Sequence, residues 1–264
     1  MNQAVLGNEV HIWTVDPNAI DAPELVSAYE RLMTPAEHER QRRFHFQKDR
    51  HQFLVARALL RTTLSRYTGI DPRGWEFAAN AYGRPEIVQP LGVERLRFSI
   101  SHTEGLIACA VTRGGEVGVD VENLKRSGDY MEIAERVFSP FEIAQIYGLP
   151  KDRQYLRFFE YWTLKESYIK ARGLGLSIPL NQFWFHLEEA KRIEITFSPE
   201  VEDDQARWQF EQWCPTPDHV MAIAIQKDKT PDLLISRFHA EPLTDTLPIR
   251  NAHRANDPGR NLRR

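Results

Sequence analysis

The sequence has little cysteine, no long apolar run and no strong excess of charge of either sign. Its two cysteines, Cys109 and Cys214, lack the number and spacing of a disulfide framework or a zinc site, so both are predicted to be small buried apolar residues. No apolar stretch approaches the ~20 residues that a membrane-spanning helix needs. The net charge of -3 gives no reason to expect nucleic acid or an anionic membrane as the main partner.

Two further patterns are absent, and their absence limits the location and the class of protein to be expected. The first residues lack the basic and then apolar segments of a secretory signal, so a cytoplasmic protein is expected. The chain also lacks the glycine-rich lysine loop with which P-loop enzymes hold phosphates. With 264 residues, 42% of them apolar, the chain is long enough to bury one substantial core or two modest ones.

Two segments carry the same signal for the start of a helix. Residues 34–37 (TPAE) and 139–142 (SPFE) each place a hydroxyl residue at the N-cap, proline at the first helical position and glutamate at the third. The pattern is helical from 22 to about 67. A long amphipathic helix is predicted over roughly 152–171, and Gly173 ends it.

Apolar segments between the helices predict strands. These lie at 75–78, 96–101, 106–111, 117–121, 183–187, 193–197, 208–213 and 220–225. The order of helix, aromatic strand and apolar strand occurs twice, which indicates two similar lobes joined by residues 112–119, although chance similarity of two such stretches is an alternative. A cleft between lobes is a natural ligand site.

We therefore expect an α+β fold: a pseudo-dimer of two similar lobes, each a small, mostly antiparallel sheet packed on a long helix. The N-terminal lobe is predicted to span residues 1–112 and the C-terminal lobe 113–245. The polar, Arg-rich residues 246–264 are predicted to form a disordered tail.

The sharpest local signal for chemistry is the segment GVDVE at residues 118–122. Because side chains alternate along a strand, Val119 and Val121 should face the core while Asp120 and Glu122 share the other face, with Cα atoms roughly 7 Å apart. A divalent cation would relieve the repulsion between two such carboxylates, and oxygen ligands suit Mg²⁺. Two solvated acids on an exposed strand face are the alternative.

A second signal lies in the long helix predicted over 152–171. Glu166 and Lys170 fall on one face at a spacing that also allows an ordinary ion pair on a solvated helix. However, Phe159, Tyr161 and Trp162 are interleaved with them, so this helix is too apolar all round to lie on the surface.

A third signal is the basic stretch 38–61, which holds seven Lys and Arg against two acids. Arginines on a largely buried helix need anionic partners. For Arg57 a phosphate ligand and the protein's own carboxylates are equally good partners, whereas for Arg61 the internal partner is favoured.

Ser101 and His102 follow one another at the end of a predicted strand, with Arg84 in the preceding turn. Adjacent strand residues point to opposite faces, so the pair is not a catalytic Ser-His dyad. Hydroxyl, imidazole and guanidinium groups at loop ends can instead form a phosphate cradle. A purely structural histidine is the alternative.

Taken in order, these segments resemble the 4'-phosphopantetheinyl transferases of the surfactin-synthetase-activating (Sfp-like) type. The likeness runs from about residue 34 to 225. It is carried by RRF at 42–44, YGRP at 82–85, FSISH at 98–102, GVDVE at 118–122, FSPFE at 138–142, WTLKESYIK at 162–170 and GLGL at 173–176.

The resemblance implies an enzyme that transfers the phosphopantetheine arm of coenzyme A to a serine hydroxyl of an acyl or peptidyl carrier protein and releases adenosine 3',5'-bisphosphate. It also implies a monomer with coenzyme A in the cleft between the lobes. Such a displacement at phosphorus needs charge neutralisation and alignment more than covalent catalysis, which a metal ion opposite a cation would supply.

By matching positions, the resemblance also assigns the site. Mg²⁺ would be held by Asp120, Glu122 and Glu166. The catalytic residues would be Asp120, Glu166, which could accept the serine proton directly or through water, and Lys170, which would stabilise charge on the transferred phosphate. Coenzyme A would be bound by Arg57, Arg84, Ser101, His102, Asp120, Glu166 and Lys170, with Arg84 and His102 near its 3'-phosphate.

The sequence departs from the family pattern at two positions in the basic stretch. Glu37 stands near the place of a lysine, and Phe53 near that of a small hydroxyl residue, so nucleotide contacts on that side differ and Arg57 could replace part of them. Two other classes also fit the residues: a Mg²⁺-dependent phosphoesterase acting on a nucleotide, and a non-catalytic protein that binds coenzyme A.

Overall fold

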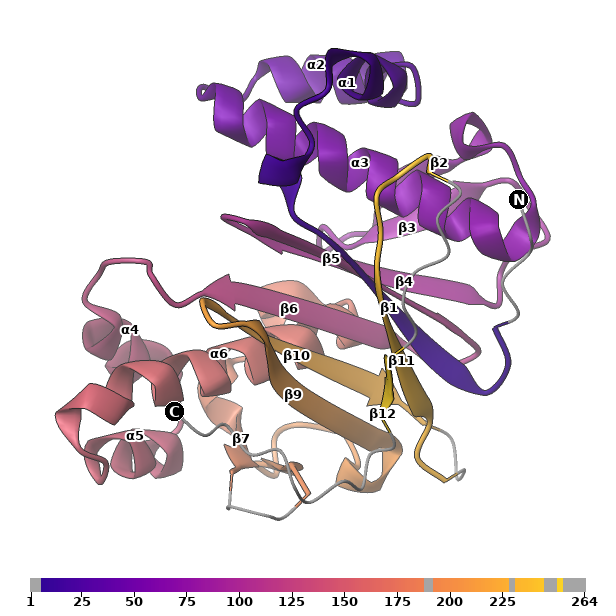
Figure 1. Ribbon diagram of the computed structural model, residues 1–264. Coiled ribbons are helices and arrows are strands. Elements are labelled where there is room, and N and C mark those ends of the chain that lie inside the picture. The colour runs from indigo at the N-terminus through magenta and orange to yellow at the C-terminus, as the bar shows by residue number, and fades with distance from the viewer. Residues whose placement is uncertain (1–5, 188–191, 228–230, 245–250, 254–264) are drawn as a thin grey trace.

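The computed structural model describes residues 6–187, 192–227, 231–244 and 251–253 (Figure 1). Its α-helices are α1 (Pro23–Glu30), α2 (Pro35–Arg42), α3 (Gln47–Thr68), α4 (Tyr130–Val137), α5 (Pro140–Tyr147) and α6 (Lys151–Arg172). Short 3-10 turns lie at Pro17–Ala19, Pro72–Gly74, Gly175–Ser177, Leu180–Gln182 and Gln205–Arg207.

The strands form two main sheets and two hairpins. They are β1 (Glu9–Val15), β2 (Glu76–Ala79), β3 (Pro85–Gln89), β4 (Leu96–Thr103), β5 (Leu106–Arg113), β6 (Val117–Asn123), β7 (Phe183–His186), β8 (Glu194–Phe197), β9 (Trp208–Thr216), β10 (His219–Gln226), β11 (Leu234–His239) and β12 (Asn251–His253). The hairpins are β2–β3 and β7–β8.

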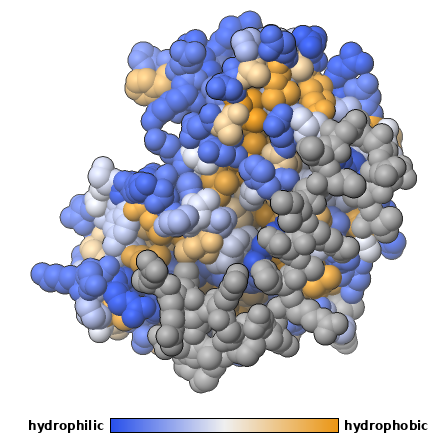
Figure 2. All heavy atoms as spheres, in the orientation of Figure 1, coloured by the Kyte–Doolittle hydropathy of each residue, from blue (hydrophilic) through white to orange (hydrophobic). Residues whose placement is uncertain are grey.

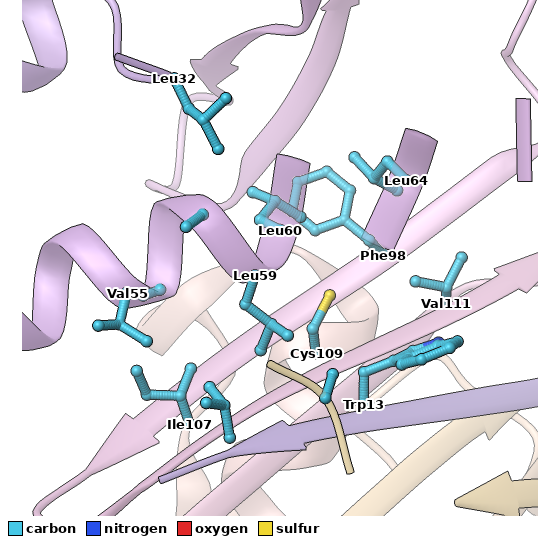
Figure 3. Packing of buried hydrophobic residues seen from close by; sticks show 14 of the residues in the cluster. Trp13, Leu32, Val55, Leu59, Leu60, Leu64, Phe98, Ile107, Cys109 and Val111 are labelled. Atoms are coloured by element: carbon cyan, nitrogen blue, oxygen red, sulfur yellow. The ribbon is translucent and has the colours of Figure 1, made fainter. Parts of the chain in front are cut away.

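The first lobe is a five-stranded sheet in the order β12-β11-β1-β5-β4, covered on one face by α3 (Figure 1). Every strand pair in it is antiparallel except β1–β11. Leu59, Leu60 and Leu64 of α3 pack over Trp13 and Cys109 of the sheet, which is the core shown in Figure 3. On the face shown in Figure 2, hydrophilic residues predominate over much of the visible surface.

The second lobe repeats this plan with the antiparallel sheet β6-β10-β9 and the helix α6. Like α3, α6 has 22 residues and ends at a glycine in the left-handed conformation, Gly173 in α6 and Gly69 in α3. Its aromatic residues pack with Phe138, Phe183 and Phe210 into a separate core. The two-lobed α+β fold with mostly antiparallel sheets is therefore confirmed.

A third apolar cluster lies between the two sheets. Val10 and Ile12 of β1 meet Val119 and Val121 of β6 and Ile223 of β10, all of them fully buried. The two lobes thus share a continuous dry contact, and β6 is the strand of the second lobe that approaches the first.

The predicted helix starts at Thr34 and Ser139 are confirmed, since both residues form capping boxes, with Glu37 and Glu142 respectively. The helix predicted over 152–171 corresponds to α6. The predicted strands all occur, with ends that shift by up to three residues. None of the helices within the described ranges is long and apolar enough to cross a membrane.

Several elements were not predicted, among them β1, β3, α4 and β11. The lobe boundary near residue 112 stays a prediction. Pairing with β1 places β11, which lies in the predicted second lobe, in the sheet of the first lobe. Of the tail predicted to be disordered, 246–250 and 254–264 lie outside the described residues, whereas Asn251–His253 pairs with β11 as strand β12.

Candidate functional site

The strand β6 carries two acids on the face opposite its buried valines, as the alternation predicts. Asp120 pairs with Ala222 and Glu122 with Val220 in the antiparallel ladder to β10. Asp120 is only 5% exposed, so it is not one of two solvated surface acids. A carboxylate at this depth needs a partner of positive charge.

Gly118 lets β6 approach α6 unusually closely. A Cβ atom at this position would lie 1.9 Å from the carbonyl oxygen of Ser167 and 2.5 Å from the backbone nitrogen of Ala171. Only a residue without a side chain fits that contact. The close approach brings Lys170 of α6 within reach of the carboxylate of Asp120.

Lys170, Asp120 and Ser101 form one hydrogen-bonded cluster that joins α6, β6 and β4. The Nζ of Lys170 donates to Asp120 Oδ1 at 2.5 Å and to Ser101 Oγ at 2.9 Å. Ser101 Oγ in turn donates to Asp120 Oδ1 at 2.9 Å. The structure therefore brings together residues from three predicted motifs, and Lys170 pairs with Asp120 rather than with Glu166.

The second acid of β6, Glu122, is paired with Arg126. Arg126 Nη1 donates to Glu122 Oε2 at 2.6 Å, and the Glu122 side chain is 13% exposed. Burial and the negative charge of Asp120 raise the pKa of Glu122, while Arg126 lowers it. Sequence reasoning missed Arg126, although its spacing of four residues from Glu122 was a usable signal.

Glu166 lies one helical turn before Lys170 on α6, outside the hydrogen-bonded cluster. Within the described ranges its carboxylate makes no hydrogen bond or ion pair. Burial raises the pKa of Glu166 to about 7, and the charge of Asp120 adds to this, whereas the charge of Lys170 opposes it. A carboxyl group in this state can take up or release a proton near neutral pH.

His102 lies on the other face of β4, as the strand alternation predicts, and its side chain is exposed. It lines a pocket of about 340 Å³ that is formed mainly by residues of the first lobe, among them Lys48, Gln52 and Gly105, with Arg126 from the second. Desolvation by the surrounding pocket and the charge of Lys170 lower the pKa of His102, although part of the side chain stays open to solvent.

Arg84 lies at the opposite end of β6 and is paired inside the protein. Its Nη1 donates to Glu116 at 2.6 Å and to the carbonyl of Ala171 at 2.9 Å, and its Nη2 donates to Glu86 at 2.9 Å. Arg84 thus connects the β2–β3 hairpin of the first lobe to the end of α6 in the second.

Arg57 and Arg61 share a single carboxylate. Arg57 Nε donates to Glu37 Oε1 at 2.6 Å, and Arg61 Nη2 donates to Glu37 Oε2 at 2.7 Å. Both side chains are therefore paired inside the protein, which is the internal alternative considered for each. The carboxylate of Glu37 is what makes this pairing possible.

No three His, Cys, Asp or Glu side chains in the described part of the chain converge into a ready-made metal cage. The donor set nevertheless fits Mg²⁺, which takes one or two carboxylates and completes its shell with water and substrate phosphate. Asp120 Oδ2 is buried and has no hydrogen-bond partner among the described residues. Together with the raised pKa values of Glu122 and Glu166, this marks a surplus of negative charge that a cation would relieve.

Two family models match the chain, one after the other. Residues 22–113 match the model described as "4'-phosphopantetheinyl transferase, N-terminal", and residues 116–224 match that of the "4'-phosphopantetheinyl transferase superfamily". Together the two matches include all the predicted site residues.

Individual relatives agree with the family models. The chain is 30% identical to 4'-phosphopantetheinyl transferase HetI of Nostoc sp. over 225 residues, which is 85% of this chain and 90% of the relative. It is also 30% identical to 4'-phosphopantetheinyl transferase Sfp of Bacillus subtilis over 216 residues, 81% of this chain and 92% of the relative. A solved holo-[acyl-carrier-protein] synthase of Thermotoga maritima overlaps 46% of this chain and 67% of its own, at 21% identity and a TM-score of 0.34.

Proposed function

The chain belongs to the 4'-phosphopantetheinyl transferase superfamily, and on that basis we propose how its residues divide the work of the reaction. The enzyme transfers the 4'-phosphopantetheine arm of coenzyme A to a serine hydroxyl of an acyl or peptidyl carrier protein. The serine oxygen forms a bond to the phosphorus next to the pantetheine. The bond from that phosphorus to the bridging oxygen breaks, and adenosine 3',5'-bisphosphate leaves.

The observation that supports this division most directly is the cluster of Lys170, Asp120 and Ser101. It places one cation and two oxygen ligands where three elements from both lobes meet. Lys170 would donate to the oxygens of the transferred phosphate, where negative charge increases as the bond to the leaving group breaks. In that state the phosphate would replace part of the contact that Lys170 makes with Asp120.

Glu166 is proposed to accept the proton of the attacking serine, directly or through one water molecule. Without a metal ion, burial raises the pKa of Glu166 to about 7; bound Mg²⁺ would favour the ionised form that can accept the proton. Its carboxylate makes no hydrogen bond or ion pair with the described residues that would hold it permanently in the charged form.

Asp120, Glu122 and Glu166 are the residues that would hold Mg²⁺. Bound there, the ion would supply charge neutralisation at the pyrophosphate of coenzyme A. The unpaired, buried Asp120 Oδ2 is the oxygen best placed to gain from it. Arg126 would keep Glu122 oriented toward the cluster through its 2.6 Å contact.

The nucleotide part of coenzyme A is assigned to Arg57, Arg84, Ser101 and His102. Arg84 donates to Glu116 before β6, whereas His102 shares its pocket with Arg126 beyond the other end of that strand. We therefore propose that the two residues contact different parts of coenzyme A, and not the single 3'-phosphate that the resemblance implies for both. The carboxylates that now neutralise Arg57 and Arg84 would have to share these arginines with phosphate, so their contribution to affinity is smaller than that of an unpaired arginine.

The remaining proposals concern the location, the oligomeric state, the lobes and the partners of the enzyme. We propose that it works as a cytoplasmic monomer of two lobes, residues 1–112 and 113–245, of which the second contributes β11 to the sheet of the first. We also propose that it has neither nucleic acid nor a membrane as partner. The slight net charge of -3 supports the last point, because a strong affinity for either partner requires a large basic surface.

A direct test is to incubate the protein with an apo carrier protein, coenzyme A and Mg²⁺ and to follow the mass of the carrier. We expect the phosphopantetheine increment with the wild type and its loss with Asp120→Ala, while the exposed Asp71→Ala serves as a control that keeps full activity. Product released from coenzyme A without any carrier would instead support a phosphoesterase. An unmodified set of several carrier types, with folded protein, would rule the transferase out.

A further inference from the structure

The strands β4 and β6 are joined by a regular row of side-chain hydrogen bonds. The backbone N–H groups of Val119, Val121 and Asn123 donate to the hydroxyls of Ser99, Ser101 and Thr103, at 3.0, 3.4 and 3.3 Å respectively. Donor and acceptor are 20 positions apart in each pair. We call this row the hydroxyl seam.

The seam takes the place of a backbone ladder. β4 is the last strand of its sheet, and β6 is the first strand of the other, where it pairs with β10 on its far side. Since a buried N–H without a partner is costly, the free edge of β6 must find acceptors. Hydroxyls on every second residue of β4 supply them, so the two sheets are held in register by side chains alone.

The middle bond of the seam is also part of the candidate site. The hydroxyl of Ser101 donates to Asp120 and accepts from Lys170 and from Val121 N–H. A hydroxyl has one proton to donate and two lone pairs to accept, so these three contacts use its full capacity. The direction of the Ser101 proton, and with it the contact to Asp120, therefore depends on where β6 lies.

The hydroxyls of Ser99 and Thr103 accept the two outer bonds of the seam. Neither hydroxyl contacts any of the proposed catalytic or metal-binding side chains. They do, however, hold the backbone on either side of both acids, since Asp120 follows Val119 and Glu122 precedes Asn123. Thr103 is itself fixed through its carbonyl oxygen, which accepts from Gln52 of α3 at 2.5 Å.

We propose that Ser99 and Thr103 are positioning residues for the transfer reaction. Their hydroxyls fix β6 against β4 and so set where Asp120 and Glu122 stand relative to Ser101 and Lys170. The inference rests on the proposed function of the cluster, but it concerns two residues outside it. A shift of β6 by a fraction of an ångström would misplace both acids together, and displacements on that scale strongly lower the rate of the reaction.

The test removes the hydroxyl acceptors of Ser99 and Thr103 and keeps side chains of similar size and shape. In the double variant Ser99→Ala/Thr103→Val we expect kcat with saturating coenzyme A and Mg²⁺ to fall roughly 10-fold to 100-fold. We also expect a higher Mg²⁺ concentration for half activation and little change in the KM for coenzyme A. The conservative pair Ser99→Thr/Thr103→Ser keeps both hydroxyls and should stay within about 3-fold of the wild type.

Two controls separate positioning from stability. Thr62→Val removes a buried hydroxyl that binds only helix carbonyls of α3, and should leave kcat unchanged whatever it does to the unfolding temperature. Amide hydrogen exchange, measured without any ligand, should be roughly 10-fold faster or more at Val119 and Asn123 in the double variant. This readout does not depend on activity, so it tests the seam even if the wild type transfers nothing.

The proposal is overturned if the double variant is folded and keeps kcat within about twofold of the wild type. It is also overturned if the conservative pair is as impaired as the double variant. Should the double variant fail to fold, the single variant Thr103→Val is compared with Thr103→Ser by the same criteria. A wild type that fails to modify any carrier would instead contradict the proposed function.

Discussion

Glu37 shows how one carboxylate can serve two buried arginines. Its side chain is 12% exposed, and it also accepts from the backbone N–H of Thr34 at 2.9 Å as part of the capping box of α2. Burial alone would raise the pKa of Glu37, but the charge of Arg57, the Thr34 hydrogen bond and the charge of Arg61 together lower it below its usual value.

A pH-dependent loss of stability follows for Glu37→Gln. Because the pKa of Glu37 is lower in the folded chain than in the unfolded chain, its contribution is complete above the unfolded value and is lost as the pH falls through the folded value. At pH 7 we expect the variant to lose about 3 kcal/mol of unfolding free energy, since two buried guanidinium groups lose their counter-charge. Urea unfolding at pH 7 and at about pH 3 measures the difference.

The control for this prediction is Glu39→Gln, two residues along the same helix. Glu39 is exposed and pairs only with Arg43 on the surface. Its removal should not change the urea midpoint at either pH. A deficit of Glu37→Gln that is as large in acid as at neutral pH would contradict the assigned role of the ionised carboxylate.

At the scale of elements, the contact between β6 and α6 decides whether the site exists. Gly118→Ala would place a methyl group 1.9 Å from the carbonyl oxygen of Ser167, so the helix must move away from the strand. We expect Lys170 to lose its contact with Asp120 and kcat to fall by about 100-fold. Overpacking at this contact should also cost about 1–3 kcal/mol of unfolding free energy.

This expectation is tested by measuring the transfer kinetics and the urea unfolding of Gly118→Ala, with Gly7→Ala as the control variant. Gly7 has no atom within 4 Å of an added Cβ, so its variant should match the wild type in both measurements. Near wild-type kcat in Gly118→Ala would show that the site tolerates a displaced α6.

The same scale shows which features the sequence could predict. Helix starts at Thr34 and Ser139 and the end of α6 at Gly173 depend on residues within one helical turn, so local patterns were sufficient. The shared face of Asp120 and Glu122 likewise follows from strand alternation. The parallel pairing of β11 with β1 joins residues more than 200 positions apart in the chain, and no local pattern encodes it.

For the site, the sequence predicted the residues better than their partners. Separate motifs point to Ser101, Asp120 and Lys170, and the helical spacing groups Lys170 with Glu166 because the two share a helix face. The structure pairs Lys170 with Asp120 instead, since the absent side chain of Gly118 brings β6 onto α6. Contacts of this kind depend on how two distant elements pack.

At the scale of the whole molecule, three connections tie the lobes together in addition to the apolar cluster between the sheets and the contacts of Lys170 and Arg84. The first is the hydroxyl seam, and the second is the contact of His219 Nε2 with the carbonyl oxygen of Glu104 at 2.8 Å. The third is β11, which carries the chain from the second sheet into the first. Its Arg237 pairs with Glu211 of β9, in the second sheet, and the guanidinium carbon lies 4.0 Å from the centre of the Trp213 ring. Lobes joined in these ways should unfold together.

Ligand binding should therefore stabilise both lobes at once. We expect one thermal transition without ligand, and a shift of that whole transition when coenzyme A and Mg²⁺ are added, because a ligand bound between the lobes favours only the assembled form. At 100 times the dissociation constant the gain is about 2.7 kcal/mol, which for a chain of this size corresponds to roughly 5–10 °C.

Calorimetry with coenzyme A, first with Mg²⁺ and then with EDTA, tests this coupling and the metal assignment in one series. Chelation should remove much of the shift in the wild type, because the pyrophosphate would then face Asp120, Glu122 and Glu166 without a counter-ion. In Asp120→Ala the shifts with Mg²⁺ and with EDTA should become nearly equal. Two separate transitions, of which coenzyme A moves only one, would show that the lobes bind and unfold independently.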